Sequence, residues 1–163
     1  MERIYLVDGA RTAFGTFGGA LKDIDATTLG RIASEAAIKR SGVQAEDIDL
    51  TVFGNVLHAS NNSPYLARHV ALQSGVPIAS PSLSVNRLCG SGLQSVVSAA
   101  QSLMLGEGRL ALTGGTENMS MTPHVLRGAR FGTKLGSPQI DDMLWAGLTD
   151  EYIGAGMGVT AEN

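Results

Sequence analysis

The sequence predicts an α/β protein in which helices cover both faces of a parallel sheet. Short apolar runs alternate with longer amphipathic stretches, and this alternation is typical of strands joined by crossover helices. Apolar residues make up 44% of the chain and charged residues 17%, a composition that supports a packed core. Glycine accounts for 21 of the 163 residues, which indicates many tight turns and close backbone contacts.

The first predicted elements are a strand and a helix. Residues 4–7 form a continuous apolar run, which predicts a buried strand. After Thr27, apolar side chains recur at helical spacing until Gly42, a typical stop signal. The apolar positions of this helix are Leu29, Ile32, Ala33, Ala36 and Ala37.

Two strands with a short helix between them follow. Residues 50–53 predict a second short strand, and residues 82–85 predict a third. Pro64 opens the intervening helix, and Gly75 and Pro77 close it.

A third helix is predicted directly after Gly92, ending at Gly106. Residues 109–113 then predict a fourth strand. The apolar stripe of the helix contains Leu93, Val96, Val97, Ala100, Leu103 and Met104.

The pattern changes beyond this strand. Residues 118–140 contain no acidic residue and show no helical period, which predicts a long loop or a small subdomain. The segment carries Arg127, Arg130 and Lys134. These side chains could steer an anionic ligand such as a phosphate, take part in subunit assembly, or simply be solvated.

Composition excludes several classes of protein. The net charge of -3 is opposite to that of a general nucleic-acid binder. A single cysteine excludes an internal disulfide framework and favours a reducing compartment. The amino terminus shows no secretory signal, and no run of about 18 apolar residues predicts a membrane span.

Cys89 is the candidate nucleophile. It lies between a predicted strand and the first turn of the third helix, and ligands of open α/β sheets bind at that edge. The helix N-terminus favours a thiolate there, and Gly90 and Gly92 leave room for a thioester. A lone cysteine is also commonly a small buried side chain, so position alone leaves both interpretations open.

A catalytic base is harder to find. A helix end stabilises a negative charge by up to about 2 kcal/mol, so a second group such as an imidazole is expected to assist the cysteine. His58, His69 and His124 lie in no motif that marks a base, and a surface or packing role is expected for each.

Residues 85–95, which contain Cys89, resemble the nucleophile segment of the thiolase family. The resemblance extends along the whole chain in the family's order, and two further segments resemble its 3-ketoacyl-CoA thiolase branch. The other family segments are residues 11–15, 54–57, 114–120, 147–150 and 157–163, and the branch segments are residues 65–70 and 130–137.

The resemblance implies a thiolase-like layered fold and a domain division. Residues 1–118 would form the amino-terminal half-core, a mostly parallel mixed sheet flanked by helices that lacks its last strand. Residues 119–163 would begin an inserted loop domain. Thiolases are about twice as long as this chain, so the chain is expected to be incomplete and to need a carboxyl-terminal half.

The resemblance also assigns residues to the chemistry. Cys89 would accept the acyl group, and its own N–H would contribute to an oxyanion hole. Leu148 and Met157 would contact coenzyme A, although both could equally be ordinary packing residues. Thiolases use a histidine in a Gly-His-Pro motif and a second cysteine in a Cys-x-Gly-Gly-Gly motif, and this sequence contains neither motif. The chain alone is therefore expected to turn over poorly or not at all.

The predicted function is thiolase acyl transfer, in 3-ketoacyl-CoA thiolysis or in condensation of acetyl-CoA. Coenzyme A thioesters would be substrates, with no metal and no permanently bound cofactor. Two alternatives stay open: a ketoacyl synthase of the same superfamily, and a non-catalytic acyl-CoA or lipid-binding protein. A homodimer or homotetramer is expected, in the cytoplasm or alternatively in the mitochondrial matrix. An unpaired sheet edge would make an unpartnered chain prone to aggregate.

Overall fold

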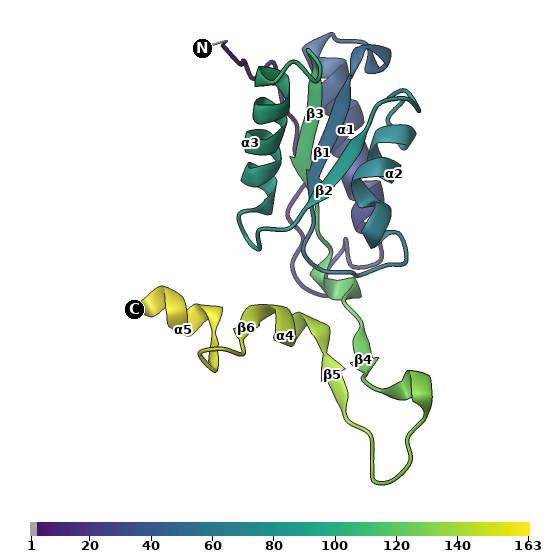
Figure 1. The fold of residues 1–163 in the computed structure, drawn as a ribbon, viewed down its shortest axis with the longest axis vertical. Coiled ribbons are helices and arrows are strands. Elements are labelled where there is room, and N and C mark those ends of the chain that lie inside the picture. Colours follow the sequence, from purple (N-terminus) through teal and green to yellow (C-terminus); the bar gives the residue numbers. More distant parts are fainter. Residues whose placement is uncertain (1–2) are drawn as a thin grey trace.

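The computed structural model describes residues 3–163 and shows a layered body from which the last part of the chain extends (Figure 1). Among these residues, the core sheet consists of three parallel strands in the order β2-β1-β3. Their bounds are Leu50–Gly54 for β1, Ser82–Val85 for β2 and Ala111–Gly115 for β3. The predicted parallel α/β class is therefore confirmed.

Helices lie on both faces of this sheet (Figure 1). On one face, α1 (Ala26–Ser41) and α2 (Leu66–Gln73) pack against each other and the strands, whereas α3 (Ser91–Met104) covers the opposite face. The central strand β1 is buried along its whole length, so its alternate side chains enter the two cores. Phe53 belongs to the core beside α2, and Val52 packs in the core beside α3.

Helix α1 starts and stops at the signals expected from the sequence. Asp25 caps its N-terminus, where a carboxylate oxygen accepts a hydrogen bond from Thr28 N at 3.0 Å. Gly42 caps its C-terminus with φ 73°, a conformation that suits glycine.

The buried face of α1 differs from the predicted apolar stripe. Gly30 and Ser34 are buried, whereas Ile32 is 42% exposed. A Cβ atom on Gly30 would lie 3.0 Å from both Thr116 and Val70. The helix approaches its neighbours too closely for large side chains, and small residues therefore form its inner face.

Helix α3 departs from its predicted apolar stripe more strongly than α1 does. The residues that it buries against the sheet are the small Ser91, Ser95 and Ala99. Within the predicted stripe, Leu93 is 71% exposed and Val97 is 42% exposed. The stripe identified the helix correctly, but of its side chains Leu103 packs against the core whereas Leu93, Val97 and Met104 are exposed.

The short helix α2 follows the prediction closely. A 3-10 turn, η2 (Ser63–Tyr65), carries Pro64 at its start and leads directly into α2. Leu66 and Val70 are fully buried, and Gly75 follows the helix with φ 86°. Another 3-10 turn, η1 (Ala45–Asp47), precedes β1.

The predicted strand at residues 4–7 is wrong. These residues pair with no strand that the structure describes, and Leu6 is 81% exposed. An apolar run becomes a strand only when a neighbouring backbone supplies its hydrogen bonds, and these residues have no such neighbour here.

Strand β3 begins two residues later than the sequence predicts. The backbone N–H groups of Arg109 and Leu110 donate to the carboxylate of Asp49, at 2.6 and 3.0 Å. Side-chain bonding thus occupies the start of the predicted strand, and regular pairing with β1 starts at Ala111.

Beyond β3 the chain leaves the layered body and forms a long hairpin, which is the outermost part of the extension (Figure 1). The hairpin strands pair antiparallel, as do the next two short strands. The elements are η3 (Met119–Met121), β4 (His124–Leu126), η4 (Ala129–Phe131), β5 (Ile140–Asp142), α4 (Met143–Leu148), β6 (Thr149–Asp150), β7 (Ala155–Gly156) and α5 (Met157–Glu162). Among the described residues, antiparallel pairing occurs only here, and the predicted domain boundary after residue 118 stays a prediction. None of the helices in residues 3–163 has the length and apolar character needed to cross a membrane.

Candidate active site

Cys89 is exposed on the turn that connects β2 to α3. Leu88, immediately before it, has φ 48°, the only positive φ of a non-glycine residue among residues 3–163. Such a conformation costs about 1–3 kcal/mol and persists only where surrounding contacts enforce it.

Two side chains enforce this turn. Asn86 accepts a hydrogen bond from Leu88 N at 3.0 Å through its side-chain oxygen. The Ser91 hydroxyl accepts from Arg87 N at 2.8 Å and donates to Leu88 O at 2.6 Å. The backbone on both sides of the sulfur is therefore fixed by local hydrogen bonds.

Glycines bring this turn onto the carboxyl edge of the sheet. A Cβ atom on Gly54, at the end of β1, would lie 2.5 Å from the carbonyl carbon of Ser91. A Cβ atom on Gly115, at the end of β3, would lie 3.1 Å from the Cα atom of Gly92. The first turn of α3 thus rests on strand backbone, with no side chain between them.

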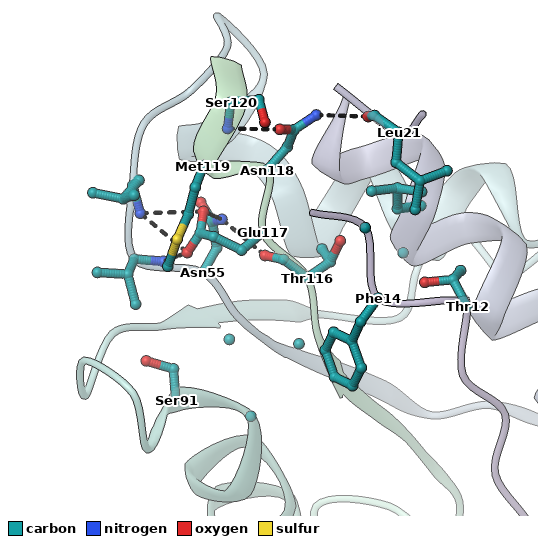
Figure 2. Close-up of a pocket in the computed structure, with 18 of the residues that line it drawn as sticks. Thr12, Phe14, Leu21, Asn55, Ser91, Thr116, Glu117, Asn118, Met119 and Ser120 are labelled. Atoms are coloured by element: carbon teal, nitrogen blue, oxygen red, sulfur yellow. Dashed lines mark hydrogen bonds between the residues drawn. The ribbon is translucent and has the colours of Figure 1, made fainter. Parts of the chain in front are cut away.

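A cavity of about 720 Å³ lies in front of this edge, and Cys89 lines it. Its walls include the β2–α3 turn, the loop after β1, the segment after β3, the amino-terminal loop at residues 10–17 and part of α1. Helix α4 contributes Leu144 and Leu148. Figure 2 shows Phe14, Ser91 and Glu117 converging on this space from different segments.

The amino-terminal wall of the cavity is held by hydrogen bonds. The side-chain amide of Asn118 donates to the carbonyl oxygens of Leu21 and Ile24, at 3.2 and 2.7 Å (Figure 2). The N–H of Gly18 donates to the Ser120 hydroxyl at 3.0 Å. The glycine-rich loop at residues 15–19 forms a turn, and the Gly18 bond ties it to the segment after β3.

Glu117 is the titratable group most strongly engaged by this site. Its carboxylate accepts hydrogen bonds from Asn55 Nδ2 at 2.7 Å and from Val56 N at 2.8 Å, with weaker ones from Leu57 N (Figure 2). Burial raises the pKa of Glu117 above its usual value, against the opposite effect of these bonds and of nearby His58. Sequence reasoning noted the motif around Glu117 but assigned this residue no role.

The two predicted coenzyme A contacts differ in their position. Leu148 lines the cavity together with Cys89. Met157 is half-buried at the start of α5 and is not among the residues that line the cavity.

No histidine in residues 3–163 lines the cavity. His69 stacks on Tyr65, with ring centroids 5.7 Å apart, and His58 and His124 are exposed. His124 Nε2 lies 4.0 Å from a carboxylate oxygen of Asp142 on the neighbouring hairpin strand.

The predicted basic segment lies on the hairpin. Arg127 forms an ion pair with Asp141 across the two strands, at 2.6 Å, while Arg130 and Lys134 are exposed. The described residues contain no group of three or more His, Cys, Asp or Glu side chains placed to hold a metal ion.

Comparison with known proteins identifies the family. The sequence profile of the family described as "Thiolase, N-terminal domain" matches residues 4–163. The chain is 47% identical to human mitochondrial 3-ketoacyl-CoA thiolase over 164 aligned positions, and 45% identical to a beta-ketothiolase of Cupriavidus necator over 162. The alignments cover 100% and 99% of this chain but 41% of each relative.

The fold agrees with that comparison. A crystal structure of human mitochondrial 3-ketoacyl-CoA thiolase in complex with CoA superposes with a TM-score of 0.93 at 47% identity. The superposition covers 96% of this chain and 40% of that chain. This chain therefore belongs to the thiolase family, and residues 4–163 correspond to its amino-terminal domain.

Proposed function

We propose that this protein is an acyltransferase that forms an acyl thioester on Cys89. In thiolysis, the Cys89 sulfur attacks the 3-keto carbon of a 3-ketoacyl-CoA. The bond between C2 and C3 then breaks, and acetyl-CoA leaves after C2 takes up a proton. The thiol of a second CoA attacks the acyl-cysteine, which releases a shortened acyl-CoA and returns the cysteine.

The observation that carries the proposal is the placement of Cys89. Its thiol is exposed on a constrained turn, lines a cavity and precedes the first turn of a 14-residue helix. A buried structural cysteine would be neither exposed nor open to a cavity. The N-terminus of α3 also favours negative charge beside the sulfur.

The proposed substrates are CoA thioesters. Curated relatives are named as 3-ketoacyl-CoA thiolases and acetyl-CoA acetyltransferases, and one solved relative is in complex with CoA. Leu148 would lie beside the bound thioester because it lines the same cavity as Cys89. Met157 is kept as a second contact on the strength of the sequence resemblance.

The condensation of two acetyl groups would use the same intermediate. Cys89 would take the acetyl group of one acetyl-CoA and release CoA. Deprotonated C2 of a second acetyl-CoA would then attack the acetyl-cysteine and form acetoacetyl-CoA. Both directions need a base and a proton carrier. Since no histidine of residues 3–163 lines the cavity, we expect this chain to acylate slowly and to turn over poorly.

Acylation can be tested separately from turnover. The purified protein is incubated with acetyl-CoA, and its intact mass and the released CoA are measured. We expect a gain of one acetyl group, located on Cys89 by peptide mapping, with one CoA released for each. Cys89→Ser keeps the size of the side chain but should form no adduct on this timescale.

The same experiment separates the alternatives. Binding of acetyl-CoA without any adduct would contradict the proposal and favour a non-catalytic binding protein. Decarboxylation of malonyl-CoA in preference to acetyl transfer would favour a ketoacyl synthase.

The proposed assembly is a homo-oligomer, supported by the exposed apolar side chains Leu93, Val97 and Met104 on α3. The proposed compartment is a reducing one, because the only cysteine is a free exposed thiol. Relatives named as mitochondrial enzymes and relatives from bacteria leave the mitochondrial matrix and the cytoplasm as the two settings.

A further inference from the structure

Hydrogen bonds from side chains connect the segments that follow the three strands of the core sheet, next to the turn that carries Cys89. Glu117 follows β3, Asn55 and Val56 follow β1, and Asn86 follows β2. The loop after β1 is bonded on one side by Glu117 and on the other by Asn86. It therefore joins the segment after β3 to the turn that carries Cys89.

The bonds form a continuous series that ends at the nucleophile. Val56 N donates to the Glu117 carboxylate at 2.8 Å, and Val56 O accepts from Asn86 Nδ2 at 3.3 Å. The side-chain oxygen of Asn86 accepts from Leu88 N at 3.0 Å. Leu88 is the residue with φ 48°, and Cys89 is bonded to it covalently.

The environment of Glu117 is unusual for a purely structural carboxylate. Its side chain forms no ion pair within residues 3–163, and its polar partners are neutral N–H groups and an amide. Even partial burial of a carboxylate that forms no ion pair costs free energy, and such costs are most often retained at functional sites. The location beside the cavity satisfies that expectation.

A direct catalytic role does not fit the same geometry. The carboxylate oxygens already accept bonds from Asn55, Val56 and Leu57. A negative charge close to the sulfur would also oppose formation of the thiolate. What Glu117 supplies is an acceptor that holds the loop after β1 in place.

We propose that Glu117 is a positioning residue for Cys89, acting through Val56 and Asn86 on the turn at Leu88. The role rests on Cys89 being the nucleophile of the proposed function. Removal of either Glu117 or Asn86 would loosen the same turn. Because the two side chains act in series, removal of both would add little to removal of one.

The variants are chosen to keep the fold. Glu117→Gln preserves the shape but replaces an acceptor oxygen by an NH₂ group that faces N–H donors. Asn86→Ala is the second variant, since Asn86 is exposed and its loss leaves no buried void. Glu107→Gln is the matched control, because Glu107 is an exposed glutamate beyond the other end of α3.

The first readout is the rate of alkylation of Cys89 by iodoacetamide across a range of pH. We expect Glu117→Gln and Asn86→Ala each to change the plateau rate by about threefold or more, and the double variant to match the single ones. Glu107→Gln should react like wild type. The second readout is amide hydrogen exchange, where Leu88 should lose protection in both variants while α1 keeps it.

An unchanged alkylation rate with unchanged protection at Leu88 in Asn86→Ala would overturn the inference, whether or not Glu117→Gln folds. Additive effects in the double variant would also overturn it. Alkylation requires no CoA, so this outcome is independent of the acetylation test. Normal acetylation with unaltered alkylation would reject only the role of Glu117, whereas altered alkylation without acetylation would reject only the acyltransferase proposal.

Discussion

Leu88 adopts an energetically costly backbone conformation in the site. Its φ of 48° places a branched side chain where glycine is ordinarily found, although the side chain is 59% exposed and gains little by packing. The turn is held by Asn86 and Ser91 rather than by the preference of Leu88 itself.

Two substitutions of Leu88 should therefore have different effects on the free energy of unfolding. In Leu88→Gly, relief of about 1–3 kcal/mol of strain offsets the extra entropy of the unfolded chain, so the free energy of unfolding should stay within about 1 kcal/mol of wild type. In Leu88→Val, branching at Cβ increases the steric clash between the side chain and the backbone at positive φ. The free energy of unfolding is therefore expected to fall by about 1 kcal/mol or more. Urea unfolding with a common m value measures both, and a less stable glycine variant than valine variant would contradict this account.

Some of the site at this scale was predictable from the sequence. Cys89 was predictable because a strand, two glycines and a helix start surround it in the chain. The role of Glu117 was not, because it depends on the loop after β1 lying beside the segment after β3. There Glu117 contacts Val56 and Asn55, which lie 61 and 62 positions earlier in the chain, and no local sequence pattern encodes such a contact.

At the scale of the elements, the hydrogen bonds from Arg109 and Leu110 join the start of β1 to the start of β3. These two N–H groups lower the pKa of Asp49 below its usual value. The ionised form of Asp49 is therefore favoured in the folded protein, and its contribution to stability is complete above the unfolded pKa near 3.8. The contribution is lost as pH falls through the lower, folded pKa.

Asp49→Asn tests this dependence. Near pH 7 we expect the variant to be less stable by about 1 kcal/mol, a modest value because the carboxylate is partly solvated. The difference from wild type should stay constant between about pH 5 and 7 and shrink as pH falls below about 4. Denaturant unfolding at several pH values measures it, and a difference that grows in acid would contradict the assignment.

Element prediction succeeded where the pattern depended on local bonds. Strand β2 has the predicted bounds, and Gly42 ends α1 as expected. It failed where a distant partner decides the outcome. Residues 4–7 resemble a strand yet pair with none that the structure describes, and Leu93 and Val97 of α3 are exposed because small residues occupy the positions that it buries against the sheet.

At the scale of the whole molecule, the exposed stripe of α3 predicts self-association. Leu93, Val97 and Met104 lie along one side of the helix, and each is at least 42% exposed. Isolated exposed apolar residues are common, but a stripe of this kind marks a surface that another segment or chain covers.

We expect the purified protein to associate in a concentration-dependent manner, and Val97→Glu with Met104→Glu to weaken that association about tenfold or more. Ile32→Glu is the matched control, because Ile32 is also 42% exposed but lies on α1 in the opposite helical layer. Sedimentation equilibrium measures the effect. Equal weakening by the α1 variant would show that the α3 stripe has no special role.

The contact of Gly54 and Gly115 with the first turn of α3 has a consequence for engineering. The first turn of α3 is located by main chain lying on main chain, and the Asn86 and Ser91 side chains then hold the turn that carries the sulfur. Apolar side chains of the interior could therefore be exchanged, and we expect the thiol to keep its place as long as those two positions carry only hydrogen and Asn86 and Ser91 are retained.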